Sequence, residues 1–112
     1  MNYYHLWCNL KESHKDLEFC RALDDYLGYL KSRGLIQRYS LSRRKFGFGP
    51  PSLGEFHVVI EIDDLAQLDS AFGIVARRSG ETEVRHREVY SAVTDLTTAL
   101  YRDFPDPQRG KT

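Results

Sequence analysis

The chain has 112 residues, of which 41% are hydrophobic and 29% charged, and 16 Lys and Arg residues balance 16 Asp and Glu residues. This length suffices for one domain with a buried core, and the balanced charge supplies no overall field that would attract nucleic acid or anionic lipid. No apolar run is long enough to cross a bilayer, and Met1–Tyr4 lacks the basic start of a signal peptide, so we expect a cytoplasmic protein without membrane contact.

The first half of the chain predicts a strand and a long helix. Apolar residues alternate along residues 4–10, which is the period of a strand. From Ser13 to Arg33 the apolar positions repeat at helical spacing, with Ser13 as the expected N-terminal cap. Gly34 follows directly and is expected to end the helix in a left-handed conformation.

The second half predicts three more strands and a second helix. Alternation returns over residues 35–43 and 56–62, and a helix is expected from Asp63 or Asp64 to Arg77–Arg78, ending at Gly80. Residues 84–93 are interpreted as a strand. Thr94 is then expected to cap a short helix that carries Leu96, Leu100 and Phe104 on one side.

Proline and glycine residues mark the boundaries between the predicted elements. The Pro- and Gly-rich segment 43–54 excludes regular structure and predicts a long hairpin loop that exposes Phe46 and Phe48. We expect a single domain over residues 1–104 and a flexible C-terminal tail over 105–112. Cys8 and Cys20 lie on apolar sides of their elements and are expected to be buried, reduced thiols.

The order of elements predicts an α+β fold. A βαββαβ order is typical of a four-stranded antiparallel sheet with two helices on one face. The other face is left open, and strand parity identifies its side chains. If Tyr4, Leu6 and Cys8 face the helices, the residues between them face away.

The open face is expected to gather an unusual set of side chains. The first and third strands should be central neighbours, which places His5, Trp7, His57 and Glu61 together, with Arg38 beside them on the second strand. Parity on residues 84–93 is ambiguous; we choose the one that also exposes His86 and Tyr90. Three imidazoles and an indole together are unusual on a solvent-exposed sheet face, and they suit a half-buried cavity.

This pattern resembles the dimeric α/β-barrel superfamily, whose ferredoxin-like protomers pair sheet to sheet. The resemblance covers roughly residues 2–93 and depends on element order, the long first helix and the polar and aromatic open face. It implies a homodimer with a cavity that holds a small organic molecule. Members include cofactor-free monooxygenases, EthD-like proteins and stress-responsive barrel proteins. If this protein is an enzyme, we therefore expect a cofactor-independent monooxygenase, an isomerase or a related small-molecule enzyme.

Each candidate side chain suits a role toward an amphipathic or aromatic ligand. An imidazole works as a general base near neutral pH, which makes His5, His57 and His86 the catalytic candidates. Arg38 could hold a carboxylate or enolate, while Trp7 and Tyr90 would clamp a planar body. Glu61 completes the expected lining.

Other classes of function stay open. The imidazoles could serve only a structural or regulatory dimer without a ligand. His5, His57 and either His86 or Glu61 could in principle converge on a metal, although no spacing motif supports this and no metal is expected. RNA recognition motifs share the βαββαβ order, but Pro50–Pro51 interrupts the second aromatic signature and the net charge is zero, so a nucleic-acid partner is disfavoured.

Overall fold

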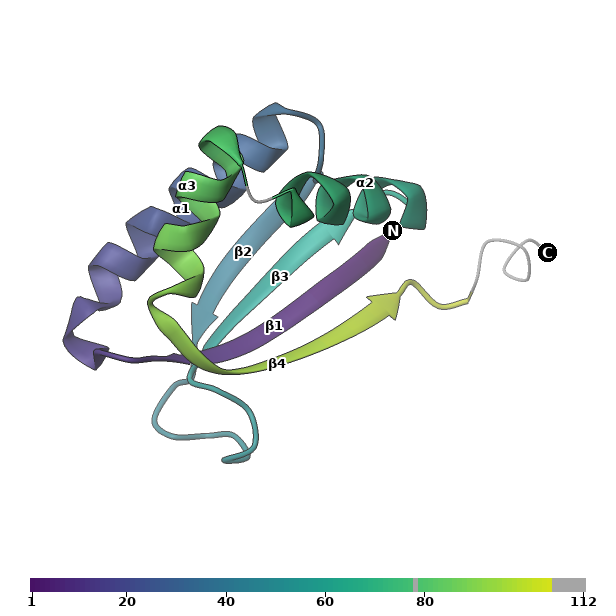
Figure 1. The fold of residues 1–112 in the computed structure, drawn as a ribbon. Helices are drawn as coiled ribbons and strands as arrows, with labels where there is room; N and C mark the ends of the chain where they lie inside the picture. The colour runs from purple at the N-terminus through teal and green to yellow at the C-terminus, as the bar shows by residue number, and fades with distance from the viewer. Residues whose placement is uncertain (78, 106–112) are drawn as a thin grey trace.

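A computed structural model describes residues 1–77 and 79–105. It contains β1 (Asn2–Leu10), a 3-10 turn (Ser13–Lys15), α1 (Asp16–Ser32), β2 (Arg38–Arg43), β3 (Phe56–Ile62), α2 (Leu65–Ala76), α3 (Gly80–Tyr90) and β4 (Val93–Arg102). The sheet has the order β2-β3-β1-β4, and every pairing is antiparallel. The expected four-stranded antiparallel sheet with β1 and β3 at its centre is confirmed. Figure 1 shows α1 and α3 side by side, with α2 across the far end of the strands.

The core lies between α1 and the sheet. Residues of α1 that recur every three or four positions are buried, namely Phe19, Leu23, Leu27 and Leu30. They pack against alternate residues of the two central strands, which include Cys8, Phe56, Val58 and Ile62. Both described cysteines are free thiols, Cys8 buried and Cys20 half-buried, and burial raises the pKa of Cys8 to about 11.

The two ends of α1 differ in how well the sequence predicts them. Gly34 has φ 73°, and the amide of Leu35 donates to the carbonyl of Leu30 at 3.0 Å, so the predicted glycine terminator is confirmed. The predicted Ser13 cap is wrong, because Ser13 begins a separate 3-10 turn and no side chain caps α1. Instead, the Leu17 amide donates to Oδ1 of Asp16 at 2.8 Å.

Asp64 caps α2 as predicted. Its Oδ1 accepts from the Gln67 amide at 2.8 Å, and Oε1 of Gln67 accepts from the Asp63 amide at 2.7 Å. This reciprocal pair satisfies two amide donors at the start of the helix. The helix ends at Ala76, earlier than expected, and Gly80, with φ 70°, begins α3 instead of ending α2. Arg78, where the helix was expected to end, lies outside the described residues.

The predicted strand over residues 84–93 is wrong, because Gly80–Tyr90 forms α3. Its buried side chains, Thr82 and Glu83, are polar, so the helix lacks the apolar period that would have identified it. Glu81 and Glu83 in the first turn and Arg87 in the last turn do match the helix dipole. The sheet is thus covered by three helices where two were expected.

The short helix predicted after Thr94 is also wrong, because Val93–Arg102 forms β4. Leu96 and Leu100 are four residues apart, a spacing that a helix and one face of a strand share. Three threonines in this segment favour a strand, since β-branched side chains fit a pleated surface. The last strand of the sheet is therefore nine residues further along the chain than predicted, beside β1.

The predicted long hairpin loop between β2 and β3 is confirmed, and Figure 1 shows it extending beyond the end of the sheet. The Arg44 guanidinium organises it by donating to the carbonyls of Pro50, Leu53 and Gly54. Phe46 and Phe48 are 83% and 82% exposed.

β2 begins at Arg38, later than predicted. Except for Pro105, the predicted tail over 105–112 lies outside the described residues. Within the described residues, no helix combines the length and apolar character needed to span a membrane.

Candidate functional site

The open face of the sheet carries three rows of side chains across four strands. Each row follows from the pairing registers, which place one residue of each strand opposite the next. From β2 to β4 the rows are Arg38, Glu61, Tyr3 and Tyr101; then Ser40, Val59, His5 and Ala99; then Ser42, His57, Trp7 and Thr97. The structure therefore brings together five predicted site residues: His5, Trp7, Arg38, His57 and Glu61.

Two imidazoles and an indole form one cluster within these rows. Nδ1 of His5 lies 2.9 Å from Nε2 of His57, and the two rings are nearly parallel. The ring of Trp7 stacks on His57 with a centroid distance of 4.7 Å and an interplanar angle of 2°. Tyr101 meets His5 edge-on at 5.0 Å. Burial and the nearby His5 lower the pKa of His57, so its ring favours the neutral state.

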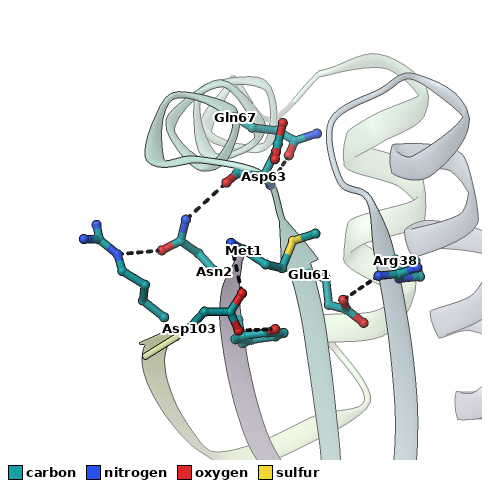
Figure 2. Close-up of polar contacts among 9 residues, drawn as sticks. Met1, Asn2, Arg38, Glu61, Asp63, Gln67 and Asp103 are labelled. Carbon is teal, nitrogen blue, oxygen red and sulfur yellow. Dashed lines mark hydrogen bonds and ion pairs between the residues drawn. The ribbon is translucent and has the colours of Figure 1, made fainter. Parts of the chain in front are cut away.

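One end of the open face is polar and already paired. Nη2 of Arg38 lies 3.2 Å from Oε1 of Glu61, and the N-terminal amine of Met1 lies 3.3 Å from Oδ2 of Asp103 (Figure 2). The Tyr3 hydroxyl donates to Oδ1 of Asp103 at 2.6 Å. This hydrogen bond raises the pKa of Tyr3. The Arg38 guanidinium, expected to hold a ligand carboxylate, has Glu61 as its partner within the protomer.

His86 and Tyr90 do not join this cluster. Both lie on α3, on the opposite side of the sheet from His5 and Trp7, because residues 84–90 are helical and not a strand. The placement predicted from strand parity is wrong for these two residues. Their rings contact each other at a centroid distance of 4.8 Å, and the ring of Tyr26 on α1 lies 5.3 Å from His86.

A cavity of about 250 Å³ lies between the sheet and the helices. Its walls are mostly aliphatic and aromatic side chains from β1, β3, β4 and all three helices, among them Leu6, Val58, Leu68, Phe72, Val75, Val89 and Leu96. The lining residues that carry a nitrogen or oxygen in the side chain are His86, Tyr26, Tyr90 and Tyr4. Phe72 and Leu96 are about half exposed, which places apolar side chains at an opening to solvent. A concave, mainly apolar cavity with few polar groups is typical of a small-molecule site.

A buried carboxylate lies behind the polar end of this cavity. Glu83 is 6% exposed, and its Oε2 lies 4.0 Å from Nδ1 of His86. Nη2 of Arg87 lies 3.6 Å from the other carboxylate oxygen. Burial, with the charge of Glu83 as a second cause, raises the pKa of Tyr26 to about 12. Tyr26 therefore keeps its proton at neutral pH.

A second depression lies on the open face, where the 44–55 loop rises beside the sheet. This groove has a volume of about 240 Å³ and is lined by Trp7, Ser42, His57, Phe48 and neighbouring loop residues. Among residues 1–77 and 79–105, no three His, Cys, Asp or Glu side chains are grouped so as to hold a metal ion.

Tyr26 and Glu83, which lie beside His86, were not predicted as site residues. Tyr26 belongs to the apolar stripe of α1, and this period indicates a core position. The spacing of Glu83, His86 and Tyr90, at i, i+3 and i+7, is that of one helix face and could have identified the cluster. Val89 and Val93, which would share one face of a strand, favoured a strand interpretation instead.

Comparison with known proteins supports the fold. No curated protein matches the sequence. A dimeric ferredoxin-like protein from an uncultured marine organism matches with 12% identity and a TM-score of 0.68, covering 95% of this chain and 97% of that one. A dimeric ferredoxin-like protein of unknown function from Jannaschia sp. CCS1 matches with 7% identity and a TM-score of 0.66, covering 91% and 98%.

A third solved structure, described as an antibiotic biosynthesis monooxygenase, matches with 18% identity and a TM-score of 0.61, covering 94% of this chain and all 100% of that one. These likenesses establish the ferredoxin-like fold and confirm the resemblance found in the sequence. The model of the family of unknown function DUF6614 matches residues 1–112, and the chain belongs to this family.

Proposed function

We propose that this protein binds one small, largely apolar organic molecule per protomer in the cavity between the sheet and the helices, and that it does so as a homodimer. The cavity carries the proposal. Its volume of about 250 Å³ exceeds the roughly 150 Å³ that suffices for a benzene-sized guest in an apolar protein interior. A one- or two-ring body fits this space, and the polar side chains at one end would orient it.

The homodimer would use the open face. Trp7, Tyr3, Val59 and Tyr101 spread apolar surface across it, and Tyr101 is 61% exposed in a single protomer. Burying such side chains contributes about 25 cal/mol per Å², which is the main favourable contribution to association. Two of the matching structures are described as dimeric ferredoxin-like proteins. Their likeness supports a homodimer here.

A second candidate position for the ligand is the groove beside the loop, which follows the original prediction of a cavity between paired sheets. Trp7 and His57 line it with parallel rings, and Phe48 of the loop forms a wall. In a homodimer the partner's sheet would close this groove. It is more open and more polar than the cavity under the helices, so it would suit a flat molecule with polar edges.

Native mass spectrometry of freshly purified protein, with and without added 4-nitroanisole, tests the proposal. We expect a dimer that carries one small molecule per protomer. Val75→Phe fills the helix-side cavity and should abolish binding, whereas Ser42→Tyr fills the groove and should leave it unchanged. Val84→Phe, at an exposed α3 position that lines neither site, is the size-matched control. The reverse pattern would assign the ligand to the groove, and a monomer without bound molecule would contradict the proposal.

A further inference from the structure

The groove beside the loop has an aromatic wall with an open space next to it. In the third row of the open face, the ring of Trp7 stacks on one side of His57 with an interplanar angle of 2°. On the other side, the residue paired with His57 is Ser42 of β2, whose short side chain does not cover the imidazole. His57, Ser42 and Phe48 of the loop all line the groove. A flat ring fits over Ser42, against the imidazole.

The imidazole of His57 is held in a fixed orientation by His5. Nδ1 of His5 and Nε2 of His57 lie 2.9 Å apart, while the ring centroids lie 5.2 Å apart with an interplanar angle of 12°. These distances place the two nitrogens between the ring centres, so the rings meet edge to edge through one shared proton. The side of His57 that faces Ser42 stays available for stacking. A ring that is fixed before binding lowers the entropy cost of placing a ligand on it.

The charges at the groove do not balance. Among the described lining residues, two guanidiniums accompany one carboxylate. Nε of Arg43 lies 2.6 Å from Oε2 of Glu55, and its Nη1 lies 3.1 Å from Oδ2 of Asp16 on α1, so two carboxylates balance Arg43. Arg44 donates instead to three loop carbonyls, and within residues 1–77 and 79–105 it has no carboxylate partner. The groove therefore carries one positive charge that no described acidic side chain balances.

Arg44 also keeps hydrogen-bond donors for a ligand. All three of its bonds to loop carbonyls are made by Nη2, which leaves the N–H groups of Nη1 without a partner among the described residues. The loop carbonyls hold the guanidinium at the wall of the groove. A planar guanidinium matches a carboxylate in charge and in shape. Arg38, expected from the sequence to hold a carboxylate, already pairs with Glu61, so Arg44 is the better candidate.

We propose that this groove is a second binding site, separate from the helix-side cavity, and that it takes a planar aromatic carboxylate. The ring lies over Ser42 against His57, and the carboxylate accepts hydrogen bonds from Arg44. The groove volume of about 240 Å³ exceeds the roughly 150 Å³ that holds a benzene-sized guest, so an acid with one or two rings fits. The site lies within one protomer and does not depend on the dimer.

The test compares 2-naphthoate with its uncharged isostere, 2-naphthamide, by fluorescence titration near neutral pH. We expect the wild-type protein to bind naphthoate about tenfold more tightly, because a hydrogen bond to a charged group is stronger than one between neutral groups. Ser42→Tyr fills the space beside His57 and should abolish binding of both molecules. Val75→Phe fills the helix-side cavity instead and should change neither affinity.

The ratio of the two affinities separates the charge of Arg44 from its role in holding the loop. Arg44→Gln removes the charge, so the preference for naphthoate over naphthamide should fall from about tenfold to about one. A loop that is merely loosened would weaken both molecules equally and leave the ratio unchanged. Lys45→Gln is the matched control, because it removes a neighbouring positive charge that does not line the groove, and its ratio should stay as in the wild type.

Three results would overturn this assignment. They are equal affinities of the wild type for the two molecules, an unchanged ratio in Arg44→Gln, and a wild type that binds neither molecule. If Val75→Phe abolishes naphthoate binding and Ser42→Tyr does not, the acid occupies the helix-side cavity, so the inference fails while the proposed function stands. Conversely, loss of 4-nitroanisole binding alone would contradict the proposed function and leave the groove site intact.

Discussion

Nδ1 of His5 and Nε2 of His57 lie 2.9 Å apart on the open face, from adjacent strands and offset by two positions in register. Such a hydrogen bond requires one donor and one acceptor nitrogen, so at least one of the two rings is neutral at the acceptor position. No carboxylate lies in the row of His5 or in the row that His57 shares with Trp7. Adding a second proton to the pair therefore removes the hydrogen bond and places like charges together.

This pair predicts a loss of stability in mild acid. Burial and His5 lower the pKa of folded His57, whereas the unfolded chain titrates near its ordinary pKa of about 6.5. Below that value the unfolded state binds more protons, so the free energy of unfolding decreases as the pH falls toward the folded pKa. Urea unfolding from about pH 8 to pH 5 measures this dependence. His57→Gln should flatten it, and an unchanged slope in that variant would contradict the assignment.

Val59 lies in the middle row of the open face, directly opposite His5. If this face joins two protomers, Val59→Glu leaves an unpaired carboxylate in the interface. We expect the dimer to weaken by about 3 kcal/mol, or roughly 100-fold in dissociation constant. Sedimentation velocity over a concentration series measures this change. Val84→Glu, on the exposed side of α3, should not alter association. Equal behaviour of the two variants would argue against pairing through the sheets.

Gly54 lies against the backbone of Cys8, where an added Cβ would overlap the carbonyl group of that residue. The neighbour is backbone in the middle of the sheet and cannot turn away as a side chain could. Gly54→Ala should therefore destabilise the protein by about 1–3 kcal/mol, the usual range for overpacking.

Gly73 is the matched control for Gly54. It lies in α2, and a Cβ there would meet no atom within 4 Å. Gly73→Ala should stabilise the helix by roughly 0.5–1 kcal/mol. Thermal unfolding of both variants measures the two effects, and equal signs would refute the close approach at Gly54.

We expect Arg44 to hold the loop that carries Phe46 and Phe48 in one conformation. Its guanidinium donates to three loop carbonyls, so Arg44→Gln should release the loop and cost on the order of 1 kcal/mol. Hydrogen exchange should accelerate for loop amides and stay unchanged in β1. Lys45→Gln is the control, since Lys45 contacts only the exposed Phe46 ring among the interactions described here. Identical exchange in the two variants would show that Arg44 does not hold the loop.

The sequence predicted β1, α1, β3 and the open-face cluster well because each element shows one unambiguous period. Alternation along residues 4–10 and 56–62 assigned His5, Trp7, His57 and Glu61 to a common face, and the registers bring them together as expected. Arg38 joins them from β2. The prediction worked because strand parity is a property of the backbone, which a single strand shows without its neighbours.

The helices and strands in the second half of the chain were harder to predict, because the apolar spacing there is compatible with both a helix and a strand. Leu96 and Leu100 suit either a helix or one face of a strand. Val89 and Val93 suggested a strand over residues 84–93, although Gly80–Tyr90 forms a helix whose buried side chains are polar. A helix that turns Glu83 and His86 toward the inside has no apolar stripe to reveal it.

By itself, the sequence determined the ferredoxin-like order of the first strands, the long amphipathic helix and the polar, aromatic character of the open face. Only the tertiary structure decided that His86 and Tyr90 lie on a helix and line an apolar cavity between the helices and the sheet, with Tyr26 and Glu83 nearby. The physical reason is that local periods depend on neighbours along the chain. A cavity and a buried Glu83 depend instead on how α1, α3 and the sheet pack against one another, with contacts between residues as distant as Tyr26 and His86.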